Sequence, residues 1–248
     1  GGSGVAGAGG SVNQPVCPNT SRGAAMVAVP VQNGAAYCVD RTEVTNAEYL
    51  AFLNSDETGT EVIPGNVCAW NTSFVPTASW PPVQNEANLP VVFVDWCDAA
   101  AYCAWAGKRL CGRVGGGAVG FDPPDTTESQ WYRACSKNDA FKYPYGDEYE
   151  ASRCNGNDYG VGNRVAAGSL ACEGGYPGIE DMSGNVLEWD DSCASANGAT
   201  DLCRVRGGSF EHDESHLRCD NEDYAHRQDK LYHVGIRCCA DSLVAAPD

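Results

Sequence analysis

The sequence predicts an α+β domain that is rich in loops, with short helices and small antiparallel sheets stapled by disulfides. Three observations support this class. The 248 residues include 29 glycines and 13 prolines, which favour turns. The helix-like and strand-like periodic stretches are short. Fourteen cysteines, an even number, are dispersed without a C-x-x-C pair, so disulfides are expected rather than a zinc ribbon.

The chain divides into an arm, one domain and a tail. Residues 1–24 are a glycine-rich arm, and residues 1–10 have no side chains that bury apolar area, which predicts a flexible tether. Such a tether suits a lipid anchor upstream of residue 1, or an arm that a neighbouring subunit holds. Residues 25–241 form the domain, and residues 242–248 are expected to fray.

Local signals place the elements of the domain. Two alternating runs around Asn33-Gly34, residues 26–31 and 36–39, predict a hairpin. Three helices are expected, each after a residue that caps helix N-termini. They are residues 46–54 after Thr45, residues 96–106 after Asp95, and residues 128–135 after Thr127. Residues 90–94 are predicted to be a buried strand, and residues 234–240 the last strand.

The charge of the chain limits the classes of partner it can bind, and its hydropathy and cysteines indicate where it is located. Sixteen basic and 33 acidic residues give a net charge of −17, which repels phosphate backbones and excludes nucleic acid as a partner. The sequence contains no run of eighteen apolar residues, so it predicts no transmembrane segment. Dispersed disulfides imply an oxidising compartment, and we expect a secreted or cell-surface protein.

Oxygen-bearing side chains are concentrated in residues 178–191, GIEDMSGNVLEWDD, which read as a turn that leads into an extended segment. They are Glu180, Asp181, Asn185, Glu188, Asp190 and Asp191. Calcium takes six to eight oxygen ligands, so this turn is a candidate calcium site. The alternative is a solvated acidic turn without a metal.

The four histidines, at positions 212, 216, 226 and 233, all lie in the last quarter of the chain. His212 and His216 are four residues apart, a spacing that aligns two imidazoles on a helix, and acidic residues flank them. A site for zinc, copper(II) or iron is one interpretation. A solvated acidic loop in which the histidines merely cluster is the other.

Several sequence blocks resemble the formylglycine-generating-enzyme (sulfatase-modifying factor) family. Residues 181–189, DMSGNVLEW, resemble the signature DMxGNVWEW of that family, and residues 204–210, RVRGGSF, resemble RVxRGGSW. Five further blocks follow the family order: YCVDRTEVTNAEYLAFLN, LPVVFVDWCDAAAYCAWAGKRLC, ESQWYRAC, YPYGDE and HVGIRC. The resemblance covers roughly four fifths of the chain and implies a C-type-lectin-like fold.

The resemblance also implies an activity, and one departure argues against it. The enzymes convert a substrate cysteine to formylglycine with copper and oxygen, using two cysteines shortly after the GGS segment as thiolate ligands. Here the corresponding window, residues 211–219, holds only Cys219. The family pairing implies the disulfides Cys103–Cys238 and Cys135–Cys219. No thiolate pair then remains, so the chain is expected to be a divergent member that binds no copper.

The family also binds calcium beside its GNxWE segment. Carried over, the ligands are Asn185, the carbonyl of Val186 and Glu188, and a second site falls at Asn155-Gly156. Calcium is therefore expected as a structural ion.

The other cysteines are assigned from their positions. Cys17–Cys38 would staple the entry of the hairpin, and Cys193–Cys203 and Cys154–Cys172 would each close a short loop. Successive strand residues point to opposite faces, so Cys239 needs a partner other than that of Cys238. Cys97 and Cys111 are both open as that partner.

Taken together, these features predict a secreted or cell-surface protein that binds a protein or glycan ligand, or that serves as a subunit of an extracellular assembly. The alternative is a metal-dependent, oxygen-using oxidoreductase whose site contains His212 and His216.

Overall fold

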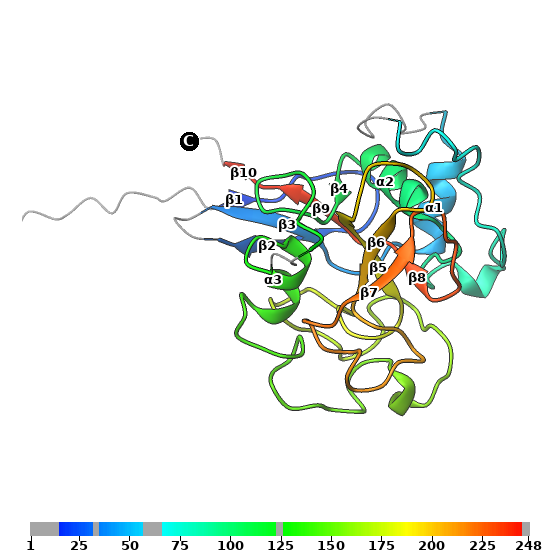
Figure 1. The fold of residues 1–248 in the computed structure, drawn as a ribbon. Helices are drawn as coiled ribbons and strands as arrows, with labels where there is room; N and C mark the ends of the chain where they lie inside the picture. The colour runs from blue at the N-terminus through cyan, green and yellow to red at the C-terminus, as the bar shows by residue number, and fades with distance from the viewer. Residues whose placement is uncertain (1–14, 32–34, 57–65, 123–125, 245–248) are drawn as a thin grey trace, which may run out of the picture.

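The computed structural model of the protein describes residues 15–31, 35–56, 66–122 and 126–244. Short helices and strands are joined by long ordered loops (Figure 1). The helices are α1 (Asn46–Leu53), η3 (Gln84–Glu86), α2 (Trp96–Trp105), α3 (Gln130–Ser136) and η4 (Asn157–Tyr159). The strands are β1 (Pro15–Val16), β2 (Met26–Pro30), β3 (Ala36–Asp40), β4 (Arg109–Leu110), β5 (Leu187–Cys193), β6 (Leu202–Arg206), β7 (Asp223–His226), β8 (Val234–Gly235), β9 (Cys238–Asp241) and β10 (Leu243–Val244). The predicted α+β class is confirmed.

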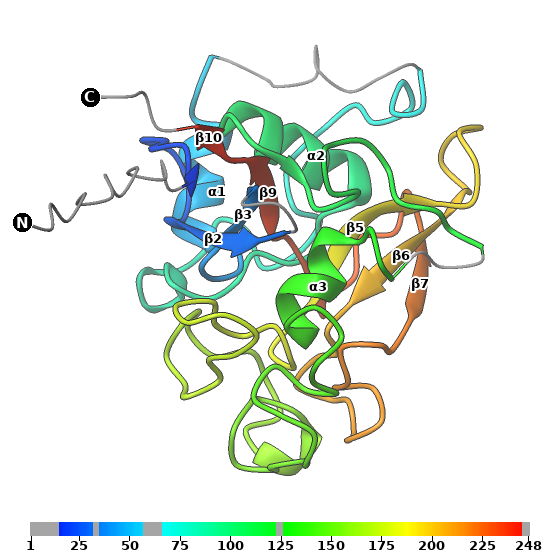
Figure 2. The ribbon, with the colours of Figure 1, turned by 90° about the vertical axis from the view of Figure 1, so that its left-hand side faces the viewer.

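The strands form small sheets. One sheet has the order β2-β3-β9-β4, a second has the order β7-β6-β5-β8, and β1 pairs with β10. The described pairs are antiparallel except β5 with β8, which is parallel. Apolar residues of α1 and α2 pack with the β5–β6 side of the molecule, while α3 packs with β3 (Figure 2).

The helix caps explain where the helices begin. Thr45 caps α1 through a capping box with Glu48, and Asp95 caps α2 in the same way, as the sequence predicts. The third prediction is wrong by two residues, because α3 begins at Gln130 and its cap is Ser129, whose hydroxyl accepts from the Tyr132 N–H at 3.2 Å. Residues 128 and 129 instead pair with the chain near Arg113, which keeps them extended.

Two predicted strands differ from the structure. Residues 90–94 form no strand, because Phe93 has a φ of 61°, which an extended chain does not allow, and only Pro90 makes a bridge, to Thr45. The run 234–240 is split into β8 and β9, which belong to different sheets. Residues 236 and 237 carry the chain from one sheet to the other.

Both ends of the described chain are joined to the domain. In the tail predicted to fray, residues 243 and 244 form β10 and pair with β1 of the arm. The hairpin prediction is confirmed, with Met26 opposite Asp40 and Pro30 opposite Ala36. The Asn33-Gly34 turn, the tether of residues 1–10 and the last four residues lie outside the described residues.

Seven disulfides use all fourteen cysteines of the chain. They are Cys17–Cys38, Cys68–Cys97, Cys103–Cys238, Cys111–Cys239, Cys135–Cys219, Cys154–Cys172 and Cys193–Cys203. The neighbours Cys238 and Cys239 bond to α2 and to the residue after β4. Two partners were open for Cys239, and the structure shows that it bonds Cys111. The other candidate, Cys97, bonds Cys68.

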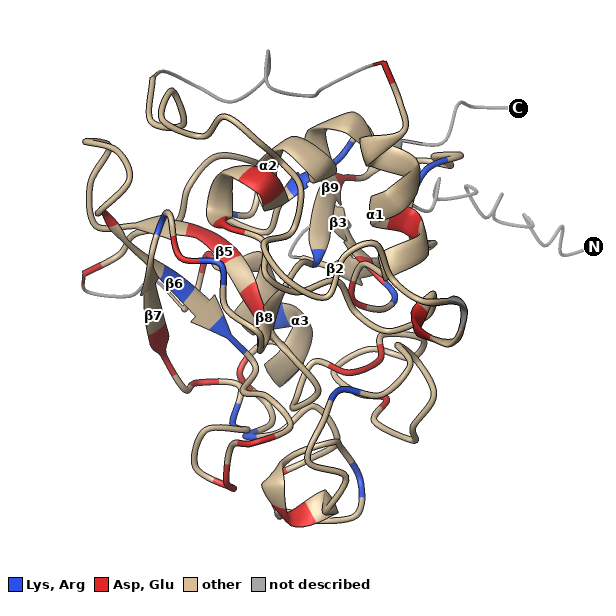
Figure 3. Cartoon of the chain, turned by 90° about the vertical axis from the view of Figure 1, so that its right-hand side faces the viewer, with Lys and Arg blue, Asp and Glu red and all other residues tan. Residues whose placement is uncertain are grey.

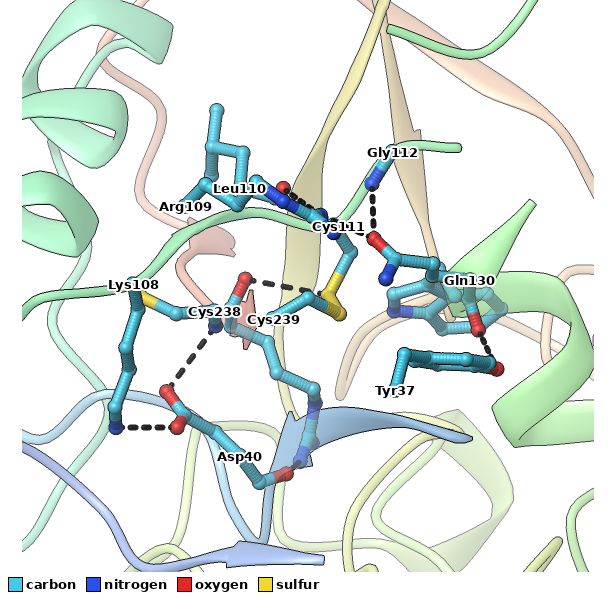
Figure 4. Close-up of a disulfide and its surroundings, with 12 residues drawn as sticks. Tyr37, Asp40, Lys108, Arg109, Leu110, Cys111, Gly112, Gln130, Cys238 and Cys239 are labelled. Carbon is cyan, nitrogen blue, oxygen red and sulfur yellow. Dashed lines mark hydrogen bonds and ion pairs between the residues drawn. A yellow bond between two sulfur atoms is a disulfide. The ribbon is translucent and has the colours of Figure 1, made fainter. Parts of the chain in front are cut away.

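The strand β9 is therefore held from both faces. Figure 4 shows the Cys111–Cys239 disulfide beside Tyr37 and Gln130, and Asp40 bonded both to Lys108 and to the backbone of Cys238. These links tie the closing strand to the first sheet and to α2. With this frame fixed, the loops 137–178 and 207–222 gather at one end of the molecule, far from β10 (Figures 1 and 2).

Candidate functional site

The segment after β6 turns sharply because two glycines permit it. Gly207 and Gly208 have φ values of 97° and 70°. A Cβ at Gly208 would lie 2.8 Å from the carbonyl oxygen of His216, so a side chain would clash with backbone there. The glycines therefore allow residues 209–219, which include the window 211–219 that corresponds to the copper-binding part of the family, to fold back so that residues 216 and 217 lie against Gly208.

No thiolate is available in this segment. Cys219 is bonded to Cys135 with an S–S distance of 2.02 Å, and both sulfurs are buried. Every other cysteine is also in a disulfide. Copper(I) coordination by a cysteine pair needs two thiolates, so the residues present do not fit that ion.

The structure brings His212 and His216 together and adds His233, which the sequence analysis did not include. The rings of His212 and His216 stack with centroids 4.9 Å apart, and the His233 ring lies edge-on, 6.0 Å from that of His212. His212 lies in irregular chain and His216 in a turn, so neither is on a helix, contrary to the expected helical alignment. The four-residue spacing of His212 and His216 does not predict that His233, which directly precedes β8, lies beside them.

Hydrogen bonding argues against the predicted metal site. The backbone N–H of Ser209 donates to Nδ1 of His212 at 2.9 Å, so that nitrogen is unprotonated and the neutral ring carries its proton on Nε2. Neither nitrogen of His212 then has a free lone pair for a metal. Among the described residues, no group of three or more His, Cys, Asp or Glu side chains is arranged to hold a metal ion.

An open cavity of about 440 Å³ lies beside this segment. It is lined by Tyr143, Asp158, Asp213, Glu214, Ser215 and Arg218. The guanidinium of Arg218 donates to both carboxylate oxygens of Asp220, at 2.8 and 2.7 Å. This pairing offsets the positive charge of Arg218, the only basic residue in the lining. The Asp213 carboxylate accepts from Ser215 and lies 2.9 Å from His216, and these contacts hold its pKa far below the usual range. The cavity therefore has a negative lining.

This cavity belongs to an acidic molecule, some of whose basic residues are buried. In Figure 3 acidic positions occur on α1, α2 and β5 and across the loops, while β6 carries two basic ones. Those two, Arg204 and Arg206, are buried, and Arg206 pairs with Asp190 at 2.9 Å. These two cations therefore do not offset the carboxylates that line the cavity.

The two asparagines expected at calcium sites meet in the structure. The Asn185 side-chain oxygen accepts from the Asn155 amide at 3.1 Å and from the Val165 N–H at 2.8 Å. The Asn185 amide donates to Glu43 Oε1 at 2.9 Å. Glu43 precedes α1 in the sequence and was not expected at the site, because its neighbours Thr42 and Val44 give no local signal for a buried carboxylate.

Two oxygens in this cluster have no hydrogen-bond donor. They are Oε2 of Glu43 and Oδ1 of Asn155, and both are buried. Burial raises the pKa of Glu43 well above its ordinary value, and the nearby Asp181 and Glu188 charges add to the shift. Buried oxygens without donors are the kind of group that a hard cation satisfies, and these two are the ones left free in the cluster.

Glu188 does not fit the predicted role of a calcium ligand. Arg237 donates to both of its carboxylate oxygens, and the Trp131 indole donates to Oε2 at 2.6 Å. With every lone pair direction used, this carboxylate is a structural partner of Arg237. Val186 follows Asn185 and is buried, while the Gly156 carbonyl already accepts from the Tyr159 N–H at 3.1 Å.

The other acidic residues of the turn are also accounted for by contacts within the protein. Glu180 pairs with Arg41 at 2.6 Å, and Asp190 pairs with Arg206. Asp181 accepts from the Gly168 N–H at 2.6 Å, and burial raises its pKa to about 6. Asp191 is half-buried, and burial raises its pKa to about 6 as well.

Two small sheets, long ordered loops and a closing strand held by adjacent disulfides define a C-type-lectin-like domain of the formylglycine-generating type. The chain matches the model of the sulfatase-modifying factor enzyme 1-like domain over residues 5–242, and it belongs to that family. Members of this family bind calcium.

Curated relatives agree with this membership. The chain is 28% identical over 272 residues to the formylglycine-generating enzyme of Thermomonospora curvata. The matched region covers 84% of this chain and 82% of that protein. It is 30% identical over 138 residues to the inactive Cα-formylglycine-generating enzyme 2 of Mus musculus, covering 52% of this chain and 40% of that protein. The chain thus spans less than half of the mouse protein.

Solved structures share the fold. PvdO from Pseudomonas aeruginosa superposes with a TM-score of 0.58 at 18% identity, covering 88% of this chain and 92% of that one. The P3c variant of the major tropism determinant superposes with a TM-score of 0.52 at 15% identity, covering 93% and 56%. Seven disulfides indicate an oxidising environment, and no helix among the described residues is long and apolar enough to cross a membrane.

Proposed function

We propose that this protein is a non-catalytic binding protein of the extracellular space or cell surface. The Cys135–Cys219 disulfide carries this proposal, because it uses the only cysteine in the segment where the family holds copper. The complete pairing of the other cysteines leaves no thiolate that could substitute. The similarity to an inactive mammalian relative supports the loss of activity.

The binding surface in this proposal is the loop end of the molecule. The negatively lined cavity beside residues 209–219 is complementary to a basic group, so the partner is a protein that presents a lysine or arginine side chain. Loops on a rigid, cross-linked frame are suited to recognition, because their backbone is already ordered before binding. The same surface could serve to join subunits of an extracellular assembly.

Calcium has a structural role in this proposal. Asn155, Asn185 and Glu43 come from three segments far apart in the sequence and are joined by hydrogen bonds. An ion held by the free oxygens of Asn155 and Glu43 would tie these segments together further. Such an ion would stabilise the loop end without taking part in chemistry.

Thiol counting and an activity assay test the proposal. The protein is alkylated under denaturing conditions with and without a reductant, and its mass is measured. We expect no alkylated cysteine without reductant and fourteen with it. The protein is also incubated with copper, oxygen and a cysteine-containing sulfatase peptide, with the Thermomonospora curvata enzyme as the positive control. Two free thiols together with formation of the peptide aldehyde would overturn the proposal.

Direct binding tests the partner class. A lysine-containing peptide and a matched peptide with glutamate in place of lysine are titrated into the protein and into an Asp158→Asn/Glu214→Gln variant. We expect measurable binding of the lysine peptide alone and at least a tenfold loss in the variant. Equal binding of both peptides, or no effect of the variant, would rule out this cavity.

A further inference from the structure

The chain immediately after α3 has an unusual backbone. Lys137, Asn138 and Asp139 are consecutive and have φ values of 54°, 58° and 70°. This left-handed region disfavours side chains, and glycine adopts it without penalty. Three consecutive non-glycine residues in this region carry backbone strain that glycine would avoid. Their side chains therefore serve a purpose other than lowering the conformational energy of the backbone.

Contacts on either side hold this triplet in place. The Asp139 N–H donates to the Ser136 hydroxyl at 2.9 Å, and the Asp139 carboxylate accepts from the Tyr132 hydroxyl. The Asn138 amide donates to the Tyr176 hydroxyl at 2.6 Å. The exposed side chains of residues 138 and 139 are thus presented in a fixed arrangement at the end of α3.

The triplet borders a cavity of about 260 Å³. The cavity is lined by Thr126, Thr127, Tyr132, Arg133, Asn138 and Asp139. These groups include hydroxyls, an amide, a guanidinium, a carboxylate and a phenol ring, so donors and acceptors alternate around one small space. Pockets for drug-sized ligands are usually about 300–1,000 Å³, so this one suits a single small polar ring.

Arg133 gives the cavity its charge preference. Within the part of the chain that the structure describes, this residue makes no ion pair, and its Nη1 donates only to the Thr127 carbonyl at 2.9 Å. Its Nε is buried without an acceptor. Among the described residues Arg133 thus has no carboxylate partner, although the sequence holds about twice as many acids as bases.

The neighbouring cavities differ in charge. The cavity beside residues 209–219 has three carboxylates and one arginine, and a third one, around Lys142, has three carboxylates and one lysine. The Arg133 cavity has one guanidinium and one carboxylate. An anionic ligand is repelled by the first two linings and is tolerated by the last.

We propose that the Arg133 cavity binds a sugar unit that carries a carboxylate, such as a uronic acid of an acidic glycan. The guanidinium of Arg133 pairs with the sugar carboxylate. The Thr126 hydroxyl, the Asn138 amide and the Asp139 carboxylate exchange hydrogen bonds with the ring hydroxyls. This site is separate from the basic-partner cavity, and the proposal does not depend on the proposed function.

Ligand titrations followed by NMR test the proposal with the full-length protein. The probes are glucuronic acid, glucose as the same ring without a carboxylate, and acetate as a carboxylate without the ring. We expect saturable shifts at residues 126–139 with glucuronic acid, and binding at least tenfold weaker with glucose and with acetate. Equal affinity for all three probes, or shifts elsewhere only, would overturn the proposal.

Two variants separate binding from folding. Arg133→Gln is expected to lower the affinity for glucuronic acid at least tenfold, whereas the matched Arg218→Gln change in the other cavity leaves it unchanged. Asn138→Gly removes the amide and relieves the left-handed backbone, so it should weaken binding while Tm stays the same or rises. If either site variant binds glucuronic acid as the unmodified protein does, the assignment is wrong.

Discussion

Glu188 and Arg237 form an ion pair that is wholly buried, with Nε and Nη2 of the arginine 2.8 and 2.7 Å from Oε1 of the glutamate. The same guanidinium donates to the carbonyls of Asp40 and Glu180, both at 2.8 Å. Arg237 lies between β8 and β9, so this one side chain links the two four-stranded sheets with the acidic turn. The glutamate is therefore a structural residue of the interior.

Replacing Glu188 by Gln should lower the free energy of unfolding by about 3–5 kcal/mol, because the Arg237 charge stays buried without its partner. Urea denaturation measures the change. The matched control is Glu150→Gln, which removes an exposed pair with Arg153 and should cost less than about 1 kcal/mol. A loss for Glu188→Gln no larger than that of the control would contradict the structural role.

His212 should make stability depend on pH. Burial, together with the His216 and His233 charges, lowers the pKa of its imidazole below 6.5. The unfolded state then binds the proton more readily, so this stability contribution is present above pH 6.5 and is lost as the pH falls through the folded pKa. Protonation also abolishes the acceptor for the Ser209 N–H.

NMR titration of the histidine ring signals measures this pKa directly. His212→Asn keeps an acceptor near Nδ1 but does not titrate, so it should reduce the loss of stability between pH 7 and pH 5. His226→Asn, on the exposed ring of β7, is the control. A His212 pKa at or above 6.5 would contradict this prediction.

Asp95 should make stability depend on pH in the opposite direction to His212. Burial, with the neighbouring Asp98 charge, raises its pKa to about 7 from 3.8, even though Lys230 lies 3.4 Å away. The folded state then holds the proton more tightly, so ionisation costs stability as the pH rises from about 4 to 7. Asp95→Asn keeps the N-cap acceptor of α2 and removes that cost.

The stability of Asp95→Asn relative to the unmodified protein should therefore rise by about 2–4 kcal/mol between pH 4 and pH 8. Asp220→Asn, at an exposed ion pair, controls for the change in net charge. The explanation fails if the difference for Asp95→Asn stays constant over this range.

Calcium should stabilise the protein through Glu43. Adding calcium after chelator treatment should raise Tm, since an ion at one hundred times its Kd contributes about 2.7 kcal/mol. Binding should release a proton, because the pKa of Glu43 is raised in the folded protein. Calorimetry in two buffers of different ionisation enthalpy measures that proton.

Glu43→Gln should remove most of the calcium response, whereas Glu188→Gln should keep it at a lower starting stability. An identical Tm with chelator and with calcium would exclude the site.

Parts of the fold follow from local sequence. The caps Thr45 and Asp95 set the starts of α1 and α2, because a capping box needs only residues three apart. The third helix was misplaced since both Thr127 and Ser129 are competent caps, and only the pairing of Ser129 with Arg113 decides between them. Local chemistry is insufficient where two candidates differ only in their distant contacts.

The candidate site depended far more on the tertiary structure. Asn155 and Asn185 were expected at two calcium sites, and their shared hydrogen bond appears only when loops thirty residues apart meet. Glu43 joins them from a separation of 142 residues. His233 and Arg133 lie within family blocks of the sequence, but neither residue was expected at a site before the structure placed its neighbours.

By itself the sequence determined the family, the oxidising environment and the lack of a second cysteine for copper, because these depend on which residues are present and in what order. The fold decided which oxygen atoms are free and which are already bonded, as the Glu188 carboxylate paired with Arg237 and the Glu43 Oε2 without a donor show. Ligand capacity is set by unsatisfied lone pairs, and those are counted only after distant segments have packed.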